Sequence, residues 1–287
     1  MLVLVAGVSG NIGQKLVDAL HARGHQVRGL GRNPAKLTAT RRAKLEDFIL
    51  TNKHYDIEAL DRACKGTEAV ICAYGVFPTE LQFDRQLFLL RAAERTNIRR
   101  FVLSTYPFIA FRRIAELSSP INPIYIFTGV LAEVFWVYPD HSPGDVELNG
   151  YWDGRDKSAS FWGNGDKPMP WSTERDAADF TAAIISRDNT EEGGCWNTVS
   201  GIHSVRDLPT VYQRVKGKEV SFKIRGTDED LKSITFEARK SATPRDFFQY
   251  MSYFYQFYTN NGIWDMAKID NDKLDVRATS PEDFFFF

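Results

Sequence analysis

Three glycines at the amino end of the chain have the spacing of a loop that binds phosphate. An apolar segment, Leu2–Ala6, leads directly into Gly7, and Gly10 and Gly13 follow. The first glycine allows a sharp turn, the second lets backbone N–H groups approach a pyrophosphate, and the third lets the next helix pack closely on the strand. Because a strand precedes this loop and an amphipathic helix follows it, the motif predicts a dinucleotide site rather than a merely structural turn.

The residues after the second predicted strand indicate which dinucleotide is bound. NAD-selective sites usually carry Asp or Glu about 20 residues beyond the glycines, where the carboxylate binds the ribose 2′-hydroxyl. This chain has no carboxylate between Asp18 and Glu46, and it offers Arg32 instead, with Arg28 and Lys36 close by. A guanidinium matches a 2′-phosphate in charge and geometry, so we predict NADP(H) with Arg32 as its ligand. For Lys36 we favour a solvated surface charge, with a contact to the cofactor as the alternative.

The bulk composition argues against several classes of function. The 287 residues include 36 basic and 37 acidic side chains, so the net charge of −1 gives no field that would steer the chain to nucleic acid or a membrane. No segment approaches the ~20 apolar residues of a transmembrane helix. The three cysteines and five histidines are sparse and scattered, which predicts neither disulfides nor a metal site. Without a signal peptide, we expect a cytoplasmic protein whose partner is a small-molecule substrate.

Strand and helix patterns alternate over the first 130 residues. Short apolar segments alternate with segments whose apolar residues recur at helical spacing, which predicts a doubly wound parallel sheet. Ligands bind outside the carboxyl ends of such strands, so Ala73–Val76, Ser104–Pro107 and Thr128–Leu131 should lie around the same crevice as the glycine loop. The predicted strands are Leu2–Ala6, His25–Leu30, Phe48–Leu50, Ala69–Ala73, Phe101–Thr105 and Ile124–Phe127; the predicted helices are Asn11–Arg23, Ile57–Cys64 and Leu81–Thr96.

The second half of the chain lacks the regular alternation of strand and helix patterns. Ser158–Trp171 predicts two strands joined by a turn at Gly163–Gly165. Thr173 and Ser204 each precede an aspartate by three residues, the pattern of a capped helix start. Further strands are expected at Cys195–Val199 and Val220–Ile224, and a last short helix after Ser280.

One predicted helix, Asp246–Asn260, is aromatic on two faces. Phe247, Met251, Phe254 and Tyr258 form a stripe at core-facing spacing, while the opposite face carries Tyr250, Tyr253 and Phe257. We expect this helix either to pack between other elements or to line a cavity.

The chain resembles the NmrA-like branch of the atypical short-chain dehydrogenases, which includes isoflavone reductases and fungal secondary-metabolism enzymes. The matching motifs are Gly7–Gly13, Gly31–Leu37, Ala69–Ile71, Arg100–Ser104, Tyr125–Gly129, Trp162–Gly165 and the helix Ser172–Ile185. The resemblance implies an NADP(H)-binding Rossmann domain over residues 1–135, with segments from about 172 to 200 packing back on it. Residues 136–287 would mainly form a smaller, irregular α+β region that binds substrate.

The resemblance also implies a set of cofactor-binding residues. They are the glycine loop and helix start, the phosphate ligands after the second strand, and the ends of later strands: Gly7, Ser9, Gly10, Asn11, Ile12, Gly13, Arg32, Lys36, Ala73, Tyr74, Gly75, Ser104, Thr105, Thr128 and Gly129.

The catalytic lysine of these reductases has no counterpart in the chain. It belongs on the helix after the fifth strand, where this chain carries Arg112 and Arg113. A guanidinium holds its proton at neutral pH and is a poor general acid. The only Tyr-x-x-x-Lys pair, Tyr212 and Lys216, lies on a late helix and is predicted to be a surface pair. The remaining candidates for proton transfer are Tyr106 at the end of the fifth strand, then Glu133, Asp140 and His141.

Three functions therefore stay open. The first is an NADP(H)-dependent reductase of a hydrophobic, aromatic or polyketide-like small molecule in secondary metabolism, with Tyr106 or water as proton donor. The second is a dehydratase, isomerase or cyclase on the same scaffold. The third is a redox-silent sensor of the dinucleotide. A shared fold does not decide among them.

Overall fold

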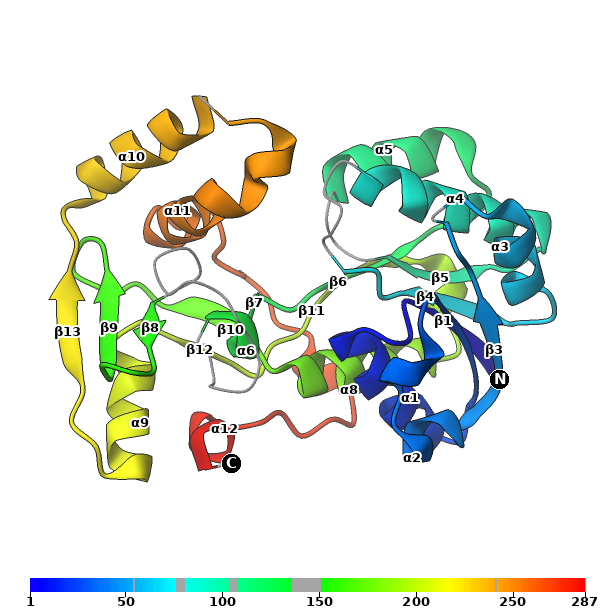
Figure 1. Ribbon diagram of the computed structural model, residues 1–287, viewed down its shortest axis with the longest axis horizontal. Coiled ribbons are helices and arrows are strands. Elements are labelled where there is room, and N and C mark those ends of the chain that lie inside the picture. Colours follow the sequence, from blue (N-terminus) through cyan, green and yellow to red (C-terminus); the bar gives the residue numbers. More distant parts are fainter. Residues whose placement is uncertain (54, 76–80, 104–107, 136–150, 241, 287) are drawn as a thin grey trace. The chain divides into compact units, whose positions relative to one another are not determined.

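Two compact units make up the chain. The computed structural model describes residues 1–53, 55–75, 81–103, 108–135, 151–240 and 242–286 (Figure 1). Unit 1 comprises Met1–Phe127, Ala177–Asn197 and Asp270–Val276; unit 2 comprises Thr128–Asp176, Thr198–Ile269 and Arg277–Phe287. The first segment of unit 1 thus runs to Phe127, and the unit also includes a late segment, 270–276, that no sequence pattern indicated.

Unit 1 is built on a parallel sheet of seven strands in the order β11-β6-β5-β4-β1-β2-β3. Every neighbouring pair in it is parallel, which confirms the predicted doubly wound Rossmann fold. The strands are β1 (Leu2–Ala6), β2 (Gln26–Gly31), β3 (Leu45–Leu50), β4 (Ala69–Cys72), β5 (Arg100–Leu103), β6 (Ile124–Phe127) and β11 (Gly194–Asn197).

Helices cover both faces of this sheet because its strands are apolar on both sides. Val3 and Val5 of β1 pack in one core, with α1 (Asn11–Ala22) and the second half of α8 (Glu174–Ile185). Leu4 and Ala6 point into the other core, beneath α3 (Ile57–Cys64), α4 (Gln82–Arg95) and α5 (Phe108–Ser118) (Figure 1). Short helical segments complete the unit: η1 (Pro34–Lys36), α2 (Ala39–Arg42), η3 (Thr190–Glu192) and η5 (Asn271–Lys273).

Unit 2 contains two small sheets, in the orders β12-β10-β7 and β13-β9-β8. A third apolar core, which includes Trp171, Tyr151 and Phe161, packs within it. The strands are β7 (Val130–Leu131), β8 (Trp152–Asp153), β9 (Ser158–Phe161), β10 (Met169–Ser172), β12 (Gly201–His203) and β13 (Ser221–Ile224). The helices are α6 (Ala132–Phe135), α9 (Asp207–Lys216), α10 (Asp228–Lys240), η4 (Pro244–Asp246), α11 (Phe247–Asn260) and α12 (Pro281–Phe286).

The strands β9 and β10 do not form the hairpin that their sequence suggested. Each forms where it was predicted, but β9 pairs with β13 and β8, whereas β10 pairs with β12 and β7. Local alternation specifies a strand without specifying its partner, so this expectation was wrong about pairing. Helix α10 was not predicted at all, because only Leu231 and Thr235 are buried along it.

The aromatic helix α11 packs against α10. The ring of Phe236 on α10 meets Phe254 and Phe257 edge-on, with ring centroids 5.9 and 5.6 Å apart. Another side of α11 places Tyr255 against Trp264 at 4.5 Å. For these rings, packing between elements accounts for the two apolar faces.

Candidate functional site

The glycine loop of unit 1 is held so closely against its neighbours that two of its positions exclude any side chain. Gly7 has φ +88°, and a Cβ atom there would lie 2.5 Å from the carbonyl oxygen of Ala73. On Gly13, a Cβ atom would lie 2.3 Å from the carbonyl oxygen of Gly7. The loop is further closed by a hydrogen bond from Gly10 N to Gly7 O at 2.9 Å. The loop therefore has the backbone geometry that the glycine motif predicts.

Helix α1 begins at this loop, and its first turn has no side-chain cap. Gly10 is its N-cap residue, and its first turn contains no acidic residue. In any α-helix the first N–H groups point out of the helix start and make no bond to a carbonyl of the same helix. Backbone donors and the helix dipole together favour an anion at this position, so the site fits the pyrophosphate of a dinucleotide.

The loop is joined to the end of β2, beyond which Arg32 lies. The N–H groups of Gly7 and Val8 both donate to Leu30 O, at 2.8 and 3.2 Å. Arg32 is exposed two residues later, and Lys36 is exposed at the end of η1. Arg28 is committed elsewhere, because its guanidinium donates to Ala63 O and Lys65 O at 3.0 and 2.6 Å. Arg28 is thus engaged by protein groups, whereas Arg32 and Lys36 are exposed, and the role of Arg32 at a 2′-phosphate stays a prediction.

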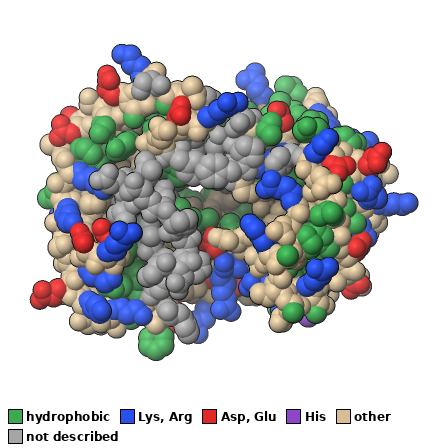
Figure 2. Space-filling view, in the orientation of Figure 1, with side chains coloured by type: hydrophobic (Ala, Val, Ile, Leu, Met, Phe, Trp, Pro, Cys, Tyr) green, Lys and Arg blue, Asp and Glu red, His purple; other side chains and the backbone are tan. Residues whose placement is uncertain are grey.

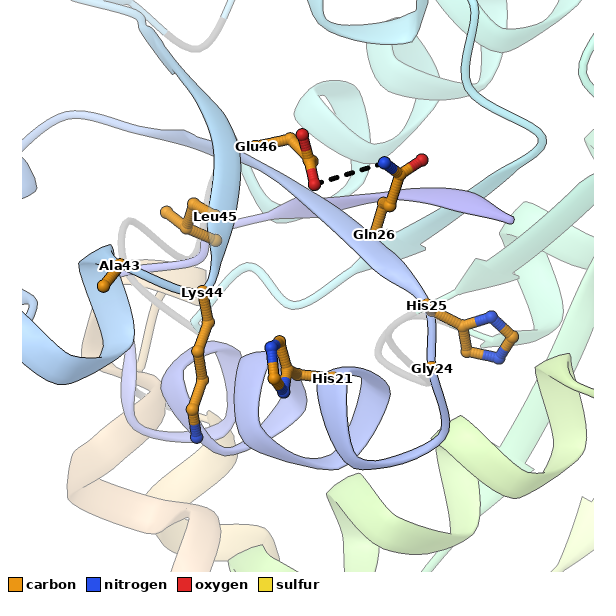
Figure 3. A pocket seen from close by; sticks show the side chains of 8 residues that line it. All are labelled: His21, Gly24, His25, Gln26, Ala43, Lys44, Leu45 and Glu46. Atoms are coloured by element: carbon orange, nitrogen blue, oxygen red, sulfur yellow. Dashed lines mark hydrogen bonds between the residues drawn. The ribbon is translucent and has the colours of Figure 1, made fainter.

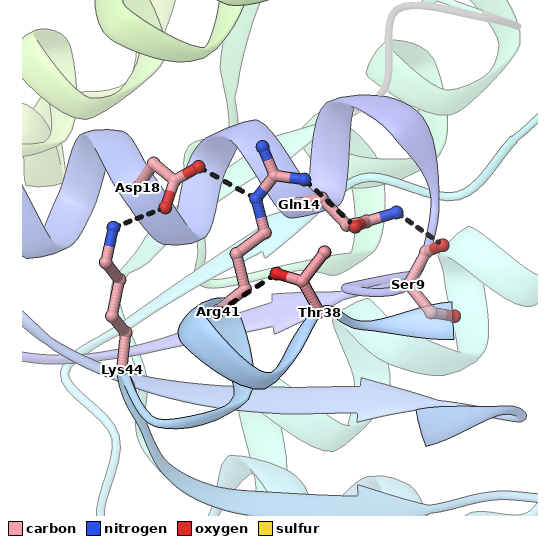
Figure 4. Close-up of polar contacts among 6 residues, drawn as sticks. All are labelled: Ser9, Gln14, Asp18, Thr38, Arg41 and Lys44. Atoms are coloured by element: carbon pink, nitrogen blue, oxygen red, sulfur yellow. Dashed lines mark hydrogen bonds and ion pairs between the residues drawn. The ribbon is translucent and has the colours of Figure 1, made fainter. Parts of the chain in front are cut away.

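A polar network that no sequence motif indicated braces α1 (Figure 4). The Asp18 carboxylate accepts from Arg41 Nε at 2.8 Å and from Lys44 Nζ at 2.5 Å. Arg41 also donates to Gln14 Oε1, and Gln14 Nε2 donates to Ser9 O. Burial alone would raise the pKa of Asp18, but the hydrogen bonds and charges of Lys44 and Arg41 outweigh burial and lower it. The carboxylate nearest the loop in sequence is thus neutralised by two cations.

The end of β4 lies on the other side of the loop. Ala73 N continues the ladder by donating to Ala6 O at 2.8 Å. Beyond it, the guanidinium of Arg85, from the first turn of α4, donates to Gly75 O and lies 5.5 Å from the centroid of the Tyr74 ring. Burial raises the pKa of Tyr74 well above its usual value, so its hydroxyl stays protonated. The sequence interpretation missed Arg85; an arginine among the apolar residues of a predicted helix was the only signal.

Several predicted site residues lie outside the described residues. They are Ser104, Thr105 and Tyr106, between β5 and α5, and Asp140 and His141, after α6. Their assignments stay predictions.

Three other predicted site residues belong to unit 2, and each has a structural role there, through a hydrogen bond or a close backbone contact. Both carboxylate oxygens of Glu133 accept the backbone N–H of Glu174, at 3.0 and 2.9 Å, and so cap α8. Thr128 O accepts from Ser172 Oγ at 2.7 Å. On Gly129, a Cβ atom would lie 2.2 Å from Pro170 O, so a glycine is needed there for close packing.

The late pair Tyr212 and Lys216 holds the last helix, α12, rather than forming an isolated surface pair. The Tyr212 ring packs on Trp152 and Phe285, with centroids 4.8 and 5.5 Å apart. Lys216 Nζ donates to Phe286 O at 3.1 Å. These contacts give the pair a structural role, and the prediction of a simple surface pair was wrong in that respect.

A cavity of about 500 Å³ in unit 1 lies at the opposite edge of the sheet from the glycine loop (Figure 3). Gln26 and Leu45, the first residues of β2 and β3, line it, so it is at the amino ends of these strands. Its polar groups already bind protein groups: Gln26 Nε2 donates to Glu46, and His25 Nε2 lies 2.7 Å from Ser186 Oγ. This cavity is not the predicted dinucleotide site.

The parts of the chain that the structure describes contain no cluster of His, Cys, Asp and Glu that could hold a metal ion. Over the same residues, no helix has the length and apolarity needed to cross a membrane. Basic and acidic side chains are interspersed on the face seen in Figure 2.

Comparison with known proteins identifies the class of unit 1. Residues 7–125 match the model of a family described as NAD(P)H-binding. This match spans the glycine loop, Arg32 and the end of β4, so unit 1 is similar to NAD(P)H-binding domains. No curated protein matches the chain.

Solved structures share the fold of the whole chain at low sequence identity. An isoflavone reductase has a TM-score of 0.73 at 16% identity, over 99% of this chain and 98% of its own. A leucoanthocyanidin reductase from Vitis vinifera, in binary complex with NADPH, has a TM-score of 0.71 at 19% identity, over 94% and 90%. A protein from Staphylococcus aureus named a nucleoside-diphosphate-sugar epimerase has a TM-score of 0.75 at 16% identity, over all of both chains.

These similarities confirm, at the level of fold, the resemblance to isoflavone reductases. The match over residues 7–125 supports a nicotinamide dinucleotide, NAD(P)H, as the cofactor. The different activities named for these structures show that the fold does not specify the reaction.

Proposed function

We propose that the protein is an NADP(H)-dependent reductase of a hydrophobic, aromatic or polyketide-like small molecule in secondary metabolism. The observation that carries this proposal is the glycine loop, which leads into an uncapped α1 and is hydrogen-bonded to the strand that ends beside the exposed Arg32. This arrangement suits a pyrophosphate at the helix and a 2′-phosphate at the arginine.

The chain's own residues would bind and orient the dinucleotide. The N–H groups at the start of α1 would hold the pyrophosphate, and Arg32 the 2′-phosphate; Ser104, Thr105, Thr128 and Gly129 stay predicted cofactor-binding residues. NADPH, when bound, supplies a hydride to an electrophilic carbon of the substrate. Tyr106, which follows β5 by three residues, would then donate a proton to the reduced product.

The structural neighbours support a hydrophobic substrate, which we propose to bind mostly to unit 2. Two structural neighbours are reductases named for isoflavones and leucoanthocyanidins.

A redox-silent sensor or a non-redox enzyme is the second candidate, favoured by the missing lysine. Helix α5 has no lysine, and Arg112 on it is engaged by Glu116 at 2.7 Å. The contacts of Glu133, a candidate acid or base for such an enzyme, do not favour it in the same way. Both of its carboxylate oxygens already accept a hydrogen bond at the start of α8.

Consumption of NADPH decides between these functions. The purified protein is incubated with NADPH and a panel of aromatic ketones, quinones and enones, and the nicotinamide absorbance is followed. Substrate-dependent loss of absorbance is the expected result. Tight binding of NADPH without turnover of any member would favour the redox-silent alternative, and the same panel is then examined for dehydration or isomerisation products.

A further inference from the structure

The glycine loop is flanked by two arginines, one beyond the end of each neighbouring strand. Strand β1 pairs with β2 on one side and with β4 on the other. Arg32 follows β2, whose Leu30 carbonyl accepts the N–H of Gly7. On the β4 side, the guanidinium of Arg85 reaches from α4 to the Gly75 carbonyl.

Arg85 is fixed close to the loop although it is 72 residues away from Gly13 in sequence. The segment Ala73–Gly75 that it contacts is the same one that touches the loop, since a Cβ atom on Gly7 would come within 3.2 Å of Tyr74 N. The residue is only 2% exposed and its guanidinium lies over the Tyr74 ring, so its position is set by packing. The Arg85 guanidinium is thus a positive charge held in a fixed position on the β4 side of the loop.

The two positively charged arginines repel each other. Burial lowers the pKa of Arg85, and the positive charge of Arg32 lowers it further. Two cations beside one loop repel each other in the free protein, and this repulsion is relieved when an anion binds between or beside them. A buried charge is less screened by solvent than an exposed one, so its field reaches a ligand that it does not touch.

We propose that Arg85 is a second cation of the NADP(H) site. It holds the Gly75 end of β4 and supplies positive potential that favours the 2′-phosphorylated adenosine half of the cofactor over the unphosphorylated half. This inference rests on the proposed NADP(H) function, and it assigns a specificity role to a residue on α4, outside the glycine loop and the segment after β2.

Binding of two cofactor fragments to the full chain tests this role. Adenosine 2′,5′-bisphosphate and AMP differ in the 2′-phosphate alone, and calorimetry measures both. Arg85→Gln should weaken binding of the bisphosphate about tenfold, as expected for loss of about 1.4 kcal/mol, and change AMP binding less than about twofold. The matched control is Arg91→Gln on the same helix, where the guanidinium binds Glu94 at 2.7 Å and away from the loop. It should leave both affinities unchanged.

The variant Arg85→Lys separates charge from shape. It keeps the cation and should keep most of the preference for the bisphosphate, and it also serves if Arg85→Gln does not fold in a thermal melt. Equal losses for both fragments would show that Arg85 only shapes the Gly75 segment, and an unchanged preference in Arg85→Gln would remove it from the site. Loss of the preference in a folded Arg85→Lys would also overturn the proposal. If the parent protein itself binds both fragments equally, the proposed NADP(H) preference fails instead, which is a distinguishable result.

Discussion

Substituting Gly13 by alanine should destabilise unit 1 by an amount that follows from two contacts. The added Cβ would lie 2.3 Å from Gly7 O and 2.9 Å from the Val8 backbone, and neither neighbour is the end of a flexible side chain. Overpacking of this kind costs ~1–3 kcal/mol, and contact with two backbone groups favours the upper end. Because alanine is more favourable than glycine within a helix by ~1 kcal/mol, part of this loss of stability is offset. The net loss of ~2 kcal/mol corresponds to a fall in Tm of ~4–8 °C for a unit of this size.

The matched substitution is Gly10→Ala, where the added Cβ would make a tight contact but no severe clash. Gly10 has φ −81°, which alanine adopts, and its Cβ would lie 3.3 Å from Gly7 O. The free energy of unfolding should fall by only ~1 kcal/mol or less, because alanine is a poorer N-cap residue than glycine by about that amount. The methyl group, however, would stand where the pyrophosphate must approach α1, so NADPH affinity should fall at least ~10-fold.

Thermal denaturation followed by circular dichroism, and calorimetry with NADPH, measure the two effects separately. The reasoning predicts that Gly13→Ala melts earlier and that Gly10→Ala melts normally but binds poorly. Parental affinity in Gly10→Ala would show that the loop is only structural. A Gly13→Ala variant as stable as the parent would contradict the close approach of α1 to the loop.

Three further predictions concern the cofactor, the chemistry and the thiols. Arg32→Ala should weaken NADPH binding by ~1.5–3 kcal/mol and leave NADH nearly unchanged in calorimetry, and equal losses would exclude Arg32 from the 2′-phosphate site. Tyr106→Phe should lower turnover ~10²–10⁴-fold in a steady-state assay without changing cofactor affinity, and normal turnover would redirect the search for the proton donor. A thiol reagent should label the exposed Cys195 and spare the buried Cys64 and Cys72 in the folded chain. Burial raises the pKa of Cys64 from 9.0 to about 12, so the unfolded thiol loses its proton first and the free energy of unfolding should fall as pH rises through that interval. Urea denaturation across this range should show a smaller fall for Cys64→Ala.

The Rossmann half of the fold was predictable because its signals are local. The strands of a parallel sheet buried on both faces appear as short apolar runs, and the expected segments Ile57–Cys64 and Ile124–Phe127 match the observed α3 and β6. In the other half, β9 and β10 were expected as a pair but lie in different sheets, since pairing depends on residues distant in sequence.

The candidate site was predictable where backbone geometry requires a particular residue type. Gly7 and Gly13 are such positions, because a Cβ atom there would clash with neighbouring backbone atoms. The Asp18–Arg41–Lys44 network and Arg85 were not predictable, since their partners are brought together only by tertiary packing. No spacing rule connects α4 to the glycine loop.

Calorimetry of the unaltered chain with NADPH and with NADH tests the central claim most directly. The account predicts one site per chain that binds NADPH more tightly than NADH, because Arg32 recognises the 2′-phosphate and no carboxylate is placed for a free 2′-hydroxyl. The difference should be at least ~10-fold, equivalent to ~1.4 kcal/mol. Absence of binding, or equal affinity for the two dinucleotides, would contradict the account.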